Sequence, residues 1–239
     1  MKIEELLPQE AFSAIGKIAS CMNQSEVHQL TKQAINCLGA DSFVYSSLII
    51  NDDDLDRPSY RYMIGCDPQW CHIYNENKWY INDPFIKYAR ENTEPVLGSQ
   101  VPLVTEGQRA MLKTAALYGY RSVMIIPTHN SSSSNERLGV LYIGSSDNPS
   151  TGEIVFNKNR LFFRSLGMEL LDWWIKYIRH ESMLKFKLSE LDVTLMQHLK
   201  NGLSIADVSG ILGLKDKKLY ERMSSIRDAF NVDKNNAAL

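Results

Sequence analysis

The sequence lacks the features that mark several large classes of protein. No uninterrupted apolar run reaches about 18 residues, so nothing in it predicts a membrane-spanning helix. The first residues, MKIEELL, are acidic and contain no long apolar region, which is not the pattern of a signal peptide. These absences predict a cytoplasmic protein that has no membrane among its partners.

The motifs of the common enzyme classes are missing as well. The sequence has no P-loop, no G-x-G-x-x-G, no H-E-x-x-H and no recognisable catalytic triad. Asp83 and Tyr74 could form an acid–base pair, but nothing marks a nucleophile or a metal beside them. We therefore predict that the protein is not an enzyme and carries no cofactor.

Cysteine is scarce, and its spacing does not predict a metal site. Cys66 and Cys71 are five residues apart, unlike the C-x2-C of zinc knuckles and redox pairs, and Cys21 and Cys37 lie far from both. We interpret all four as reduced thiols, with Cys66 in a pocket wall. The acidic run 51–56 is an alternative metal site, but acids in such a loop are usually solvated, so we predict no metal.

The composition is that of a soluble globular protein with room for one large or two ordinary domains. The chain has 239 residues, of which 44% are hydrophobic and 23% charged. The net charge is −2, so the whole chain offers no electrostatic case for binding nucleic acid. A DNA-binding face would have to be a local patch.

Periodicity over the first 150 residues predicts helices that are followed by strands and by further helices. Ser25 and Thr105 are the expected N-caps of two of these helices, and Gly39 and Gly119 are the expected stops. We predict helices over 8–22, 25–38, 84–89 and 106–118, strands over 42–50, 60–64, 122–128 and 138–145, a loop over 94–103 and a hairpin tip over 130–135. This order indicates an α/β layer sandwich.

A long helix is predicted over 161–183, and apolar residues occupy most of its circumference. Such a helix must bury two faces, one against the sheet and the other against a second subunit. A fully buried helix in a monomer is the alternative. We expect a homodimer.

The composition shifts from aromatic to charged over 180–187, which we interpret as a linker between a domain over 1–179 and a domain over 188–239. Three short helices are predicted after it, with Ser189, Ser204 and Asp216 as their N-caps. The last two helices are joined by a turn that contains glycine, which is the helix-turn-helix pattern.

The third of these helices carries a row of basic residues that can neutralise DNA phosphates: Lys215 just before it, then Lys217, Lys218, Arg222 and Arg227. The alternative is an ordinary solvated face. Three acids weaken the patch, namely Asp216, Glu221 and Asp228. Charge alone leaves both interpretations open.

The segment 65–84 is the best candidate for a binding site. Trp70 and Tyr74 are four residues apart and share a face if Pro68 begins a helix. With the acceptor Asp83 they could line an apolar pocket that has a few polar groups. Alternatively, Trp70 and Tyr74 are core aromatics, and Asp83 caps the helix that Pro84 begins.

The spacing W-x3-Y-x8-D-P at 70–84 resembles the ligand-binding domain of LuxR-type quorum-sensing transcription regulators. The resemblance implies an α/β/α sandwich with a central antiparallel sheet. It also implies that Trp70 donates to the lactone carbonyl of an acyl-homoserine lactone and that Asp83 accepts from its amide N–H. Tyr74 would line the pocket beside them.

Other positions extend or depart from this resemblance. Ser145 matches a position whose hydroxyl contacts the acyl-chain carbonyls, and Tyr62 and Cys66 complete our candidate ligand-binding residues. Cys66 stands where a tyrosine is expected, Val123 stands where a glycine is expected, and a second pocket tryptophan near Gly98 is missing. These departures make a ligand other than a standard acyl-homoserine lactone a serious alternative.

The C-terminal residues resemble the DNA-binding domain of the same family, through Leu188, Ser189, Gly202, Ser204, Val208, Leu212, Gly213, Leu219 and Val232. The resemblance implies a ligand-responsive DNA-binding transcription regulator whose partners are DNA, a lactone-like signal and a second copy of itself. The alternative is an interaction protein that heterodimerises with a related regulator and inhibits it. The acids in the third helix and a short fourth helix from Lys234 motivate that alternative.

Overall fold

The computed structural model describes residues 3–49, 61–130 and 137–230 of the chain. Two compact units are present: the first holds the described residues up to Trp174, and the second holds those from Ile175 onward. The acidic run 51–56, most of the hairpin tip predicted over 130–135 and the fourth helix predicted from Lys234 lie outside the described residues.

A five-stranded antiparallel sheet forms the centre of the first unit. Its strands are β1 (Ser42–Ile49), β2 (Arg61–Ile64), β3 (Val96–Leu97), β4 (Ser122–Asn130) and β5 (Arg137–Ser145), in the order β2-β1-β5-β4-β3. Four of them lie where the sequence predicts strands. The fifth, β3, lies within the segment predicted as a loop, because two residues are too few to show an alternating pattern.

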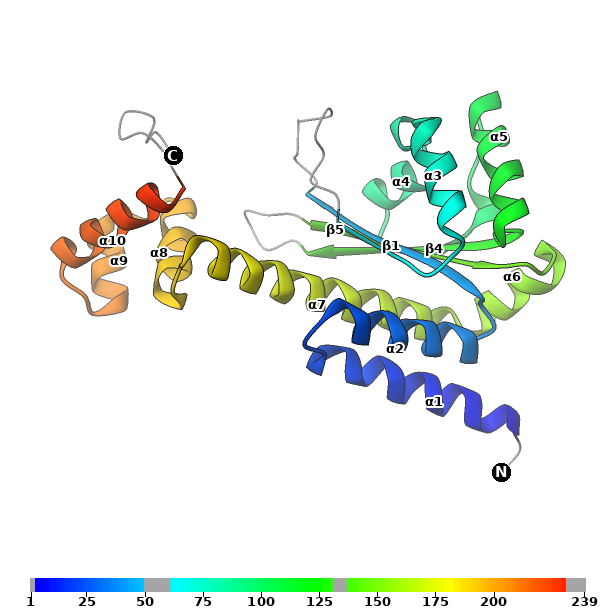
Figure 1. The fold of residues 1–239 in the computed structure, drawn as a ribbon, viewed down its shortest axis with the longest axis horizontal. Helices are drawn as coiled ribbons and strands as arrows, with labels where there is room; N and C mark the ends of the chain where they lie inside the picture. Colours follow the sequence, from blue (N-terminus) through cyan, green and yellow to red (C-terminus); the bar gives the residue numbers. More distant parts are fainter. Residues whose placement is uncertain (1–2, 50–60, 131–136, 231–239) are drawn as a thin grey trace. The chain divides into compact units, whose positions relative to one another are not determined.

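Helices cover both faces of this sheet (Figure 1). One face carries α3, α4 and α5, and the other carries α2 and the first part of α7. Helix α1 packs on α2, and α6 packs against β4. Their bounds are α1 Ile3–Lys17, α2 Gln24–Cys37, α3 Pro68–Glu76, α4 Pro84–Glu91, α5 Glu106–Ala115, α6 Pro149–Lys158 and α7 Arg160–Phe186. The predicted α/β/α sandwich with its antiparallel sheet is confirmed for this unit.

Several helix ends differ from their predicted positions. Asn23 caps α2 in place of Ser25, since its side-chain oxygen accepts from the Glu26 N–H at 3.0 Å. Both residue types are good N-caps, so the sequence alone did not separate them. The first helix begins at Ile3 rather than at Pro8, and α6 was not predicted. Thr105 caps α5 as predicted.

The first part of α7 packs closely on the sheet. At Gly167 an added Cβ would lie 3.0 Å from Thr128 Cγ2 and 3.1 Å from Ile126 Cγ2, so the helix backbone approaches β4 at a distance that only glycine allows comfortably. The neighbouring side chains on this stripe are buried: Phe163, Leu166, Leu170, Leu171 and Trp174. The helix continues to Phe186, so most of the segment 180–187, predicted as a linker, is helical.

The second unit contains the last part of α7 and three further helices: α8 (Glu190–Lys200), α9 (Ile205–Leu212) and α10 (Asp216–Ala229). Their core contains Leu195, Val208, Leu219 and Ile226. Ser189 and Ser204 form the N-terminal caps as predicted. Asp216 does not cap α10, since it is the first helical residue and Lys215 precedes it. No helix in the described ranges is long and apolar enough to cross a membrane.

Candidate ligand-binding site

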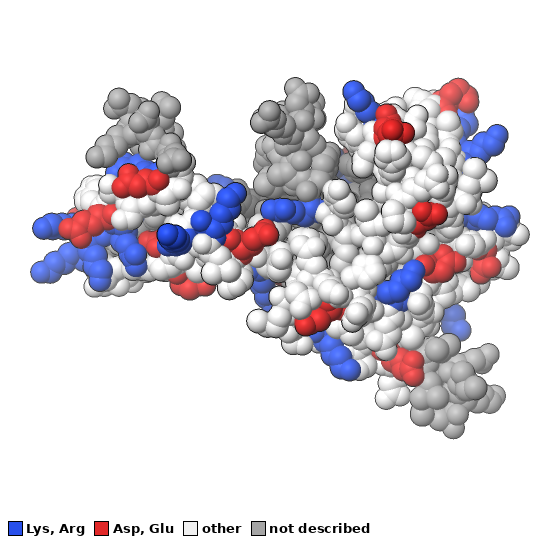
Figure 2. Space-filling view, in the orientation of Figure 1, with Lys and Arg blue, Asp and Glu red and all other residues white. Residues whose placement is uncertain are grey.

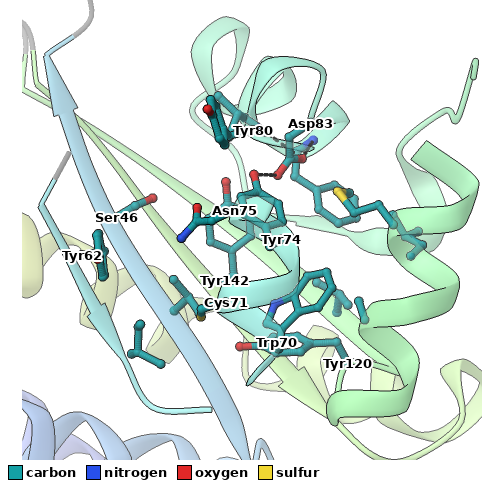
Figure 3. Close-up of a pocket in the computed structure, with 18 residues that line it drawn as sticks. Ser46, Tyr62, Trp70, Cys71, Tyr74, Asn75, Tyr80, Asp83, Tyr120 and Tyr142 are labelled. Carbon is teal, nitrogen blue, oxygen red and sulfur yellow. Dashed lines mark hydrogen bonds between the residues drawn. The ribbon is translucent and has the colours of Figure 1, made fainter. Parts of the chain in front are cut away.

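A cavity of about 410 Å³ lies between the sheet and helices α3, α4 and α5 (Figure 3). This volume falls within the range of small-molecule sites in proteins. Its wall is mostly apolar and aromatic and is formed by Val44, Ser46, Tyr62, Ile64, Trp70, Cys71, Tyr74, Asn75, Tyr80, Asp83, Phe85, Ile86, Met111, Leu112, Ala115, Tyr120, Val123 and Tyr142.

Asp83 is the buried charged group of this cavity, with 6% of its surface exposed. One carboxylate oxygen, Oδ1, accepts from the backbone N–H of Phe85 at 2.7 Å and of Ile86 at 3.4 Å, which starts α4. The other, Oδ2, accepts from the Tyr74 hydroxyl at 2.6 Å, as the dashed line in Figure 3 shows. Asp83 therefore caps a helix and lines the cavity, so the two alternative roles that the sequence offered coexist.

Burial raises the pKa of Asp83 above its ordinary value of 3.8, and the hydrogen bonds from Tyr74, Phe85 and Ile86 act in the opposite direction. A carboxylate oxygen can accept two hydrogen bonds. Oδ2 thus keeps capacity for a further donor besides the Tyr74 hydroxyl.

Trp70 anchors an aromatic cluster on the same side of the cavity. It lies on α3 with Tyr74, and their ring centroids are 5.7 Å apart in an edge arrangement, which confirms the predicted shared helix face. Trp79, Tyr118 and Tyr120 also pack on it, at 5.8, 6.5 and 6.2 Å. Within the described part of the chain its indole N–H meets no hydrogen-bond acceptor, so this donor remains for a ligand.

Four of the six predicted ligand-binding residues meet at this cavity: Trp70, Tyr74, Asp83 and Tyr62. Cys66 lies just outside the lining and packs against the same cluster of side chains.

Ser145 lies on the opposite face of the sheet. Side chains alternate along a strand, and Tyr142 of β5 points into the cavity, so Ser145, three residues on, points away from it. The Ser145 Oγ accepts from the Asp147 N–H at 3.1 Å.

The sequence did not identify several residues of the cavity wall, including Ser46, Asn75, Tyr80, Tyr120 and Tyr142. Ser46 and Tyr142 face the cavity because of strand register, which no short motif encodes. A signal was present for Asn75, because it lies four residues after Cys71 on α3 and therefore on the same face of the helix.

In the second unit, the basic residues predicted to contact DNA fall into two groups. Lys215, Lys217 and Lys218 are exposed at the start of α10. Arg222 is half-buried: its Nη2 donates to the Ser189 Oγ at 3.2 Å, and its Nε lies 3.4 Å from the Asp192 carboxylate. Arg227 is also half-buried, and Figure 2 shows both signs of charge mixed over these helices.

Metal-binding side chains do not gather in the described residues, where no group of three or more His, Cys, Asp or Glu could hold an ion.

The sandwich and its cavity define a domain that is built around a small-molecule site. The sequence matches the autoinducer binding domain family over residues 23–169, which is more than half of the chain. The protein therefore belongs to this family. No curated protein sequence matches the chain.

Solved structures show the same fold. Escherichia coli SdiA aligns with a TM-score of 0.65 and 13% identity, over 92% of this chain and 90% of that one. SdiA in complex with octanoyl-rac-glycerol aligns with a TM-score of 0.64 and 12% identity, over 93% and 88%. CepR2 from Burkholderia cenocepacia, an N-acylhomoserine lactone-dependent LuxR family transcription factor, aligns with a TM-score of 0.58 and 18% identity, over 74% and 97%.

Proposed function

We propose that this protein is a ligand-responsive transcription regulator of the LuxR type, which binds an acyl-homoserine lactone or a similar small signal. The observation that carries the proposal is the mostly apolar cavity with one buried carboxylate and one indole donor in its wall. An apolar chain bearing a polar head group fits such a wall, since a few placed polar groups orient a ligand that the apolar area binds. The matched family consists of autoinducer-binding receptor domains rather than enzymes.

In this proposal the Trp70 indole N–H donates to a carbonyl of the ligand head group. Asp83 Oδ2 accepts from a ligand N–H while it keeps its bond from the Tyr74 hydroxyl. Tyr62, 57% exposed, lies where the acyl chain would leave the buried part of the cavity. Ser145 and Cys66 do not line the cavity and have no part in the proposed contacts.

The test is to purify the protein from cells fed a panel of acyl-homoserine lactones, and from unfed cells, and to identify retained molecules by mass spectrometry. We expect one lactone to be retained. Trp70→Phe removes the indole N–H together with part of the aromatic surface of the cavity wall. We expect it to weaken binding by at least about tenfold, which is the effect of losing one buried hydrogen bond.

Trp79→Phe is the matched control. Its ring packs 5.8 Å from that of Trp70, but Trp79 does not line the cavity. Equal losses in the two variants would contradict the proposed role of the Trp70 N–H. Soluble, folded protein that retains none of the lactones would contradict a lactone ligand.

The proposal includes DNA binding by the second unit, with α10 as the recognition helix. The three exposed lysines at the start of α10 support it, because basic side chains at the N-terminal end of such a helix can reach phosphates and base edges. Arg222 acts differently, by holding α10 to the capped start of α8 through Ser189 and Asp192. Two such helices in a dimer would meet two half-sites about one helical turn apart.

Selection from random duplex DNA, followed by fluorescence anisotropy, tests this part. We expect Lys217→Ala and Lys218→Ala to lower the affinity for the selected site and to reduce its dependence on salt. Lys113→Ala, on α5 of the first unit, is the control for loss of one exposed positive charge. If the affinity for DNA were the same with and without the retained ligand, the proposed control of DNA binding by the ligand would be contradicted. The proposal that the second unit binds DNA would stand.

A homodimer through α7 is also part of the proposal. Leu161 and Met168 are seven residues apart on α7, so they share a face, and they are 78% and 40% exposed. Exposed apolar residues on one helix face often mark an interface. We expect Leu161→Glu to convert a dimer to a monomer in light-scattering chromatography, whereas Leu117→Glu, equally exposed elsewhere, leaves the dimer intact.

A further inference from the structure

Two thiols meet at the edge of the cavity. The Sγ atoms of Cys66 and Cys71 are 3.8 Å apart, and both residues are half-buried. Cys66 lies between β2 and α3, whereas Cys71 lies on α3, directly after Trp70, and lines the cavity (Figure 3). The remaining cysteines, Cys21 and Cys37, have no such thiol neighbour in the described part of the chain.

The two thiols are not equivalent. The contact with the Cys71 thiol lowers the pKa of Cys66, and burial opposes it. The nearby Tyr120 hydroxyl and, to a smaller extent, the Lys32 ammonium also lower this pKa, whereas the Asp67 carboxylate raises it. The pKa of Cys71 is raised by the same contact and by burial. Cys66 is thus the better nucleophile, because the thiolate is the reactive form, and Cys71 is placed to resolve the product.

The backbone before Cys66 is firmly anchored. The Gly65 N–H donates to the Phe43 carbonyl at 2.9 Å, and the Gly65 carbonyl accepts from Lys32 Nζ at 3.2 Å. An added Cβ at Gly65 would lie 1.9 Å from the Phe43 ring, so the strand has no room to shift on that side. Because the backbone beside Cys66 resists movement, we expect any backbone adjustment on closure of the thiol pair to occur on the Cys71 side, which is the cavity wall.

We propose that Cys66 and Cys71 form a peroxide-sensitive dithiol, whose oxidation to a disulfide reshapes the ligand cavity. The disulfide itself stands on the thiol geometry alone. Its effect on signal binding rests on the proposed function.

The reaction balances with hydrogen peroxide as the oxidant. The Cys66 thiolate attacks one peroxide oxygen, an S–O bond forms as the O–O bond breaks, and the departing hydroxide takes up a proton to leave as water. Cys71 then attacks the sulfenic sulfur, the S–S bond forms as the S–O bond breaks, and a second water leaves with the Cys71 proton. Two thiols lose two electrons, and one peroxide is reduced to two waters.

The disulfide would change the wall of the cavity. The sulfur atoms must approach from 3.8 Å to about 2.05 Å, which draws Cys71 toward the anchored strand. Trp70 adjoins Cys71 in the chain, and its ring packs on Tyr120 at 6.2 Å, so the indole donor moves with it. We expect oxidised protein to bind a cavity ligand about tenfold more weakly, as loss of one well-placed hydrogen bond would cause.

The first experiment needs no ligand. Full-length protein is treated with stoichiometric hydrogen peroxide, digested with trypsin and analysed by mass spectrometry. Both cysteines fall in the tryptic peptide 62–78, so the disulfide is a loss of about two mass units there, reversed by dithiothreitol. In Cys71→Ser we expect Cys66 to be trapped by dimedone as a sulfenic acid. Preferential oxidation of Cys21 or Cys37, or sulfinic acid at Cys66 without a disulfide, would overturn the proposal.

The second experiment measures the cavity before and after oxidation, with two probes. The apolar dye 1-anilinonaphthalene-8-sulfonate requires no cognate signal, and N-octanoyl-homoserine lactone tests the proposed ligand class by calorimetry. We expect both affinities to fall about tenfold on oxidation and to recover with dithiothreitol, with no change in Cys66→Ser. Dye affinity that shifts while no lactone binds would refute the proposed function and keep the redox inference. Affinities that are unchanged in fully oxidised protein would refute the reshaping.

Discussion

The two faces of the sheet in the first unit use the same strands for opposite purposes. On the face that α2 and α7 cover, side chains such as Phe43, Met124 and Ile126 are fully buried, and Gly167 lets α7 approach β4 closely. On the face that α3, α4 and α5 cover, the strands border a cavity of about 410 Å³. Because side chains alternate along each strand, one sheet provides a packed core on one side and an open site on the other.

The difference between the faces lies in what the helices do. The α7 face is packed with buried side chains, most of them apolar. The opposite face begins its helices with Asp67 and Asp83 caps, each followed by a proline, which fixes where α3 and α4 start. The cavity face has a buried cluster of its own, which includes Trp70, Phe85 and Met111, so both faces contribute to the free energy of unfolding.

The largest expected effect is the difference in stability loss between a Phe→Ala substitution on the packed face and one on the cavity face. Phe163→Ala removes a fully buried ring that packs on Phe156 at 5.8 Å, and we expect a loss of about 3–5 kcal/mol in the free energy of unfolding. Phe85→Ala borders the existing cavity, so about half that loss is expected. Urea denaturation measures both, and equal losses would break the comparison.

Two helical glycines test the close approach of α7. Gly167→Ala gains helix propensity but presses on Thr128 and Ile126, so we expect a net loss of about 1 kcal/mol. Gly210→Ala on α9 meets no atom within 4 Å and should gain about 0.5–1 kcal/mol. The midpoint temperatures of thermal unfolding of the two variants should therefore shift in opposite directions. A stabilised Gly167→Ala would show that α7 can move away from β4 without loss of stability.

The cavity face should also respond to pH through Asp83. Its pKa is raised in the folded state by burial, so between 3.8 and that raised value the folded protein binds more protons than the unfolded chain. The free energy of unfolding then falls as pH rises through this window. Relative to Asp83→Asn, which keeps the cap but cannot ionise, the wild type should gain stability as pH falls from about 7 toward about 4.

Asp207→Asn is the control for this pH series. Hydrogen bonds from Ser204 lower the pKa of Asp207 below 3.8, so the pH series is extended below that value. There the wild type should lose stability relative to the variant as pH falls through the lowered pKa. Urea titrations at each pH measure both differences. If the stability difference between wild type and variant changed with pH in the same direction for both aspartates, the effect of burial on Asp83 would be contradicted.

The smallest effect should come from serines on opposite faces. Ser145→Ala removes the acceptor of the Asp147 N–H, at a cost of about 1 kcal/mol in stability, and should leave binding of N-octanoyl-homoserine lactone unchanged. Ser46→Ala on β1 changes the cavity wall, and about fivefold weaker binding is expected. Weaker lactone binding in Ser145→Ala would contradict the conclusion that Ser145, on the face away from the cavity, does not affect ligand binding.

Local spacing in the sequence predicted much of the site. Trp70 and Tyr74 share a helix face because four residues make about one turn, and the Asp83–Pro84 pair predicts a capped helix start. Both are short-range rules that the rest of the chain does not disturb. The four longer strands followed from the residue pattern in the same way, whereas the α/β/α arrangement of the layers came from the resemblance to LuxR-type regulators.

Long-range register could not be predicted in this way. Whether Tyr142 or Ser145 faces the cavity depends on which way β5 is turned, and a shift of one residue exchanges the two faces. The Cys66–Cys71 contact depends on how the turn after β2 enters α3, and the spacing alone gave no reason to pair them. The hydrogen bond from Arg222 to Ser189 was not predicted either, because the two residues are 33 positions apart in the sequence.

The double use of Asp83 limits how this site can change over generations or in the laboratory. One oxygen starts α4 and the other holds the Tyr74 hydroxyl, so any replacement must supply two acceptors on a short side chain. Asparagine comes nearest, and most other replacements lose the helix start together with the binding site. New signal preferences should therefore arise first at the rim, where Tyr62 and Asn75 are exposed and can be exchanged while the fold stays intact.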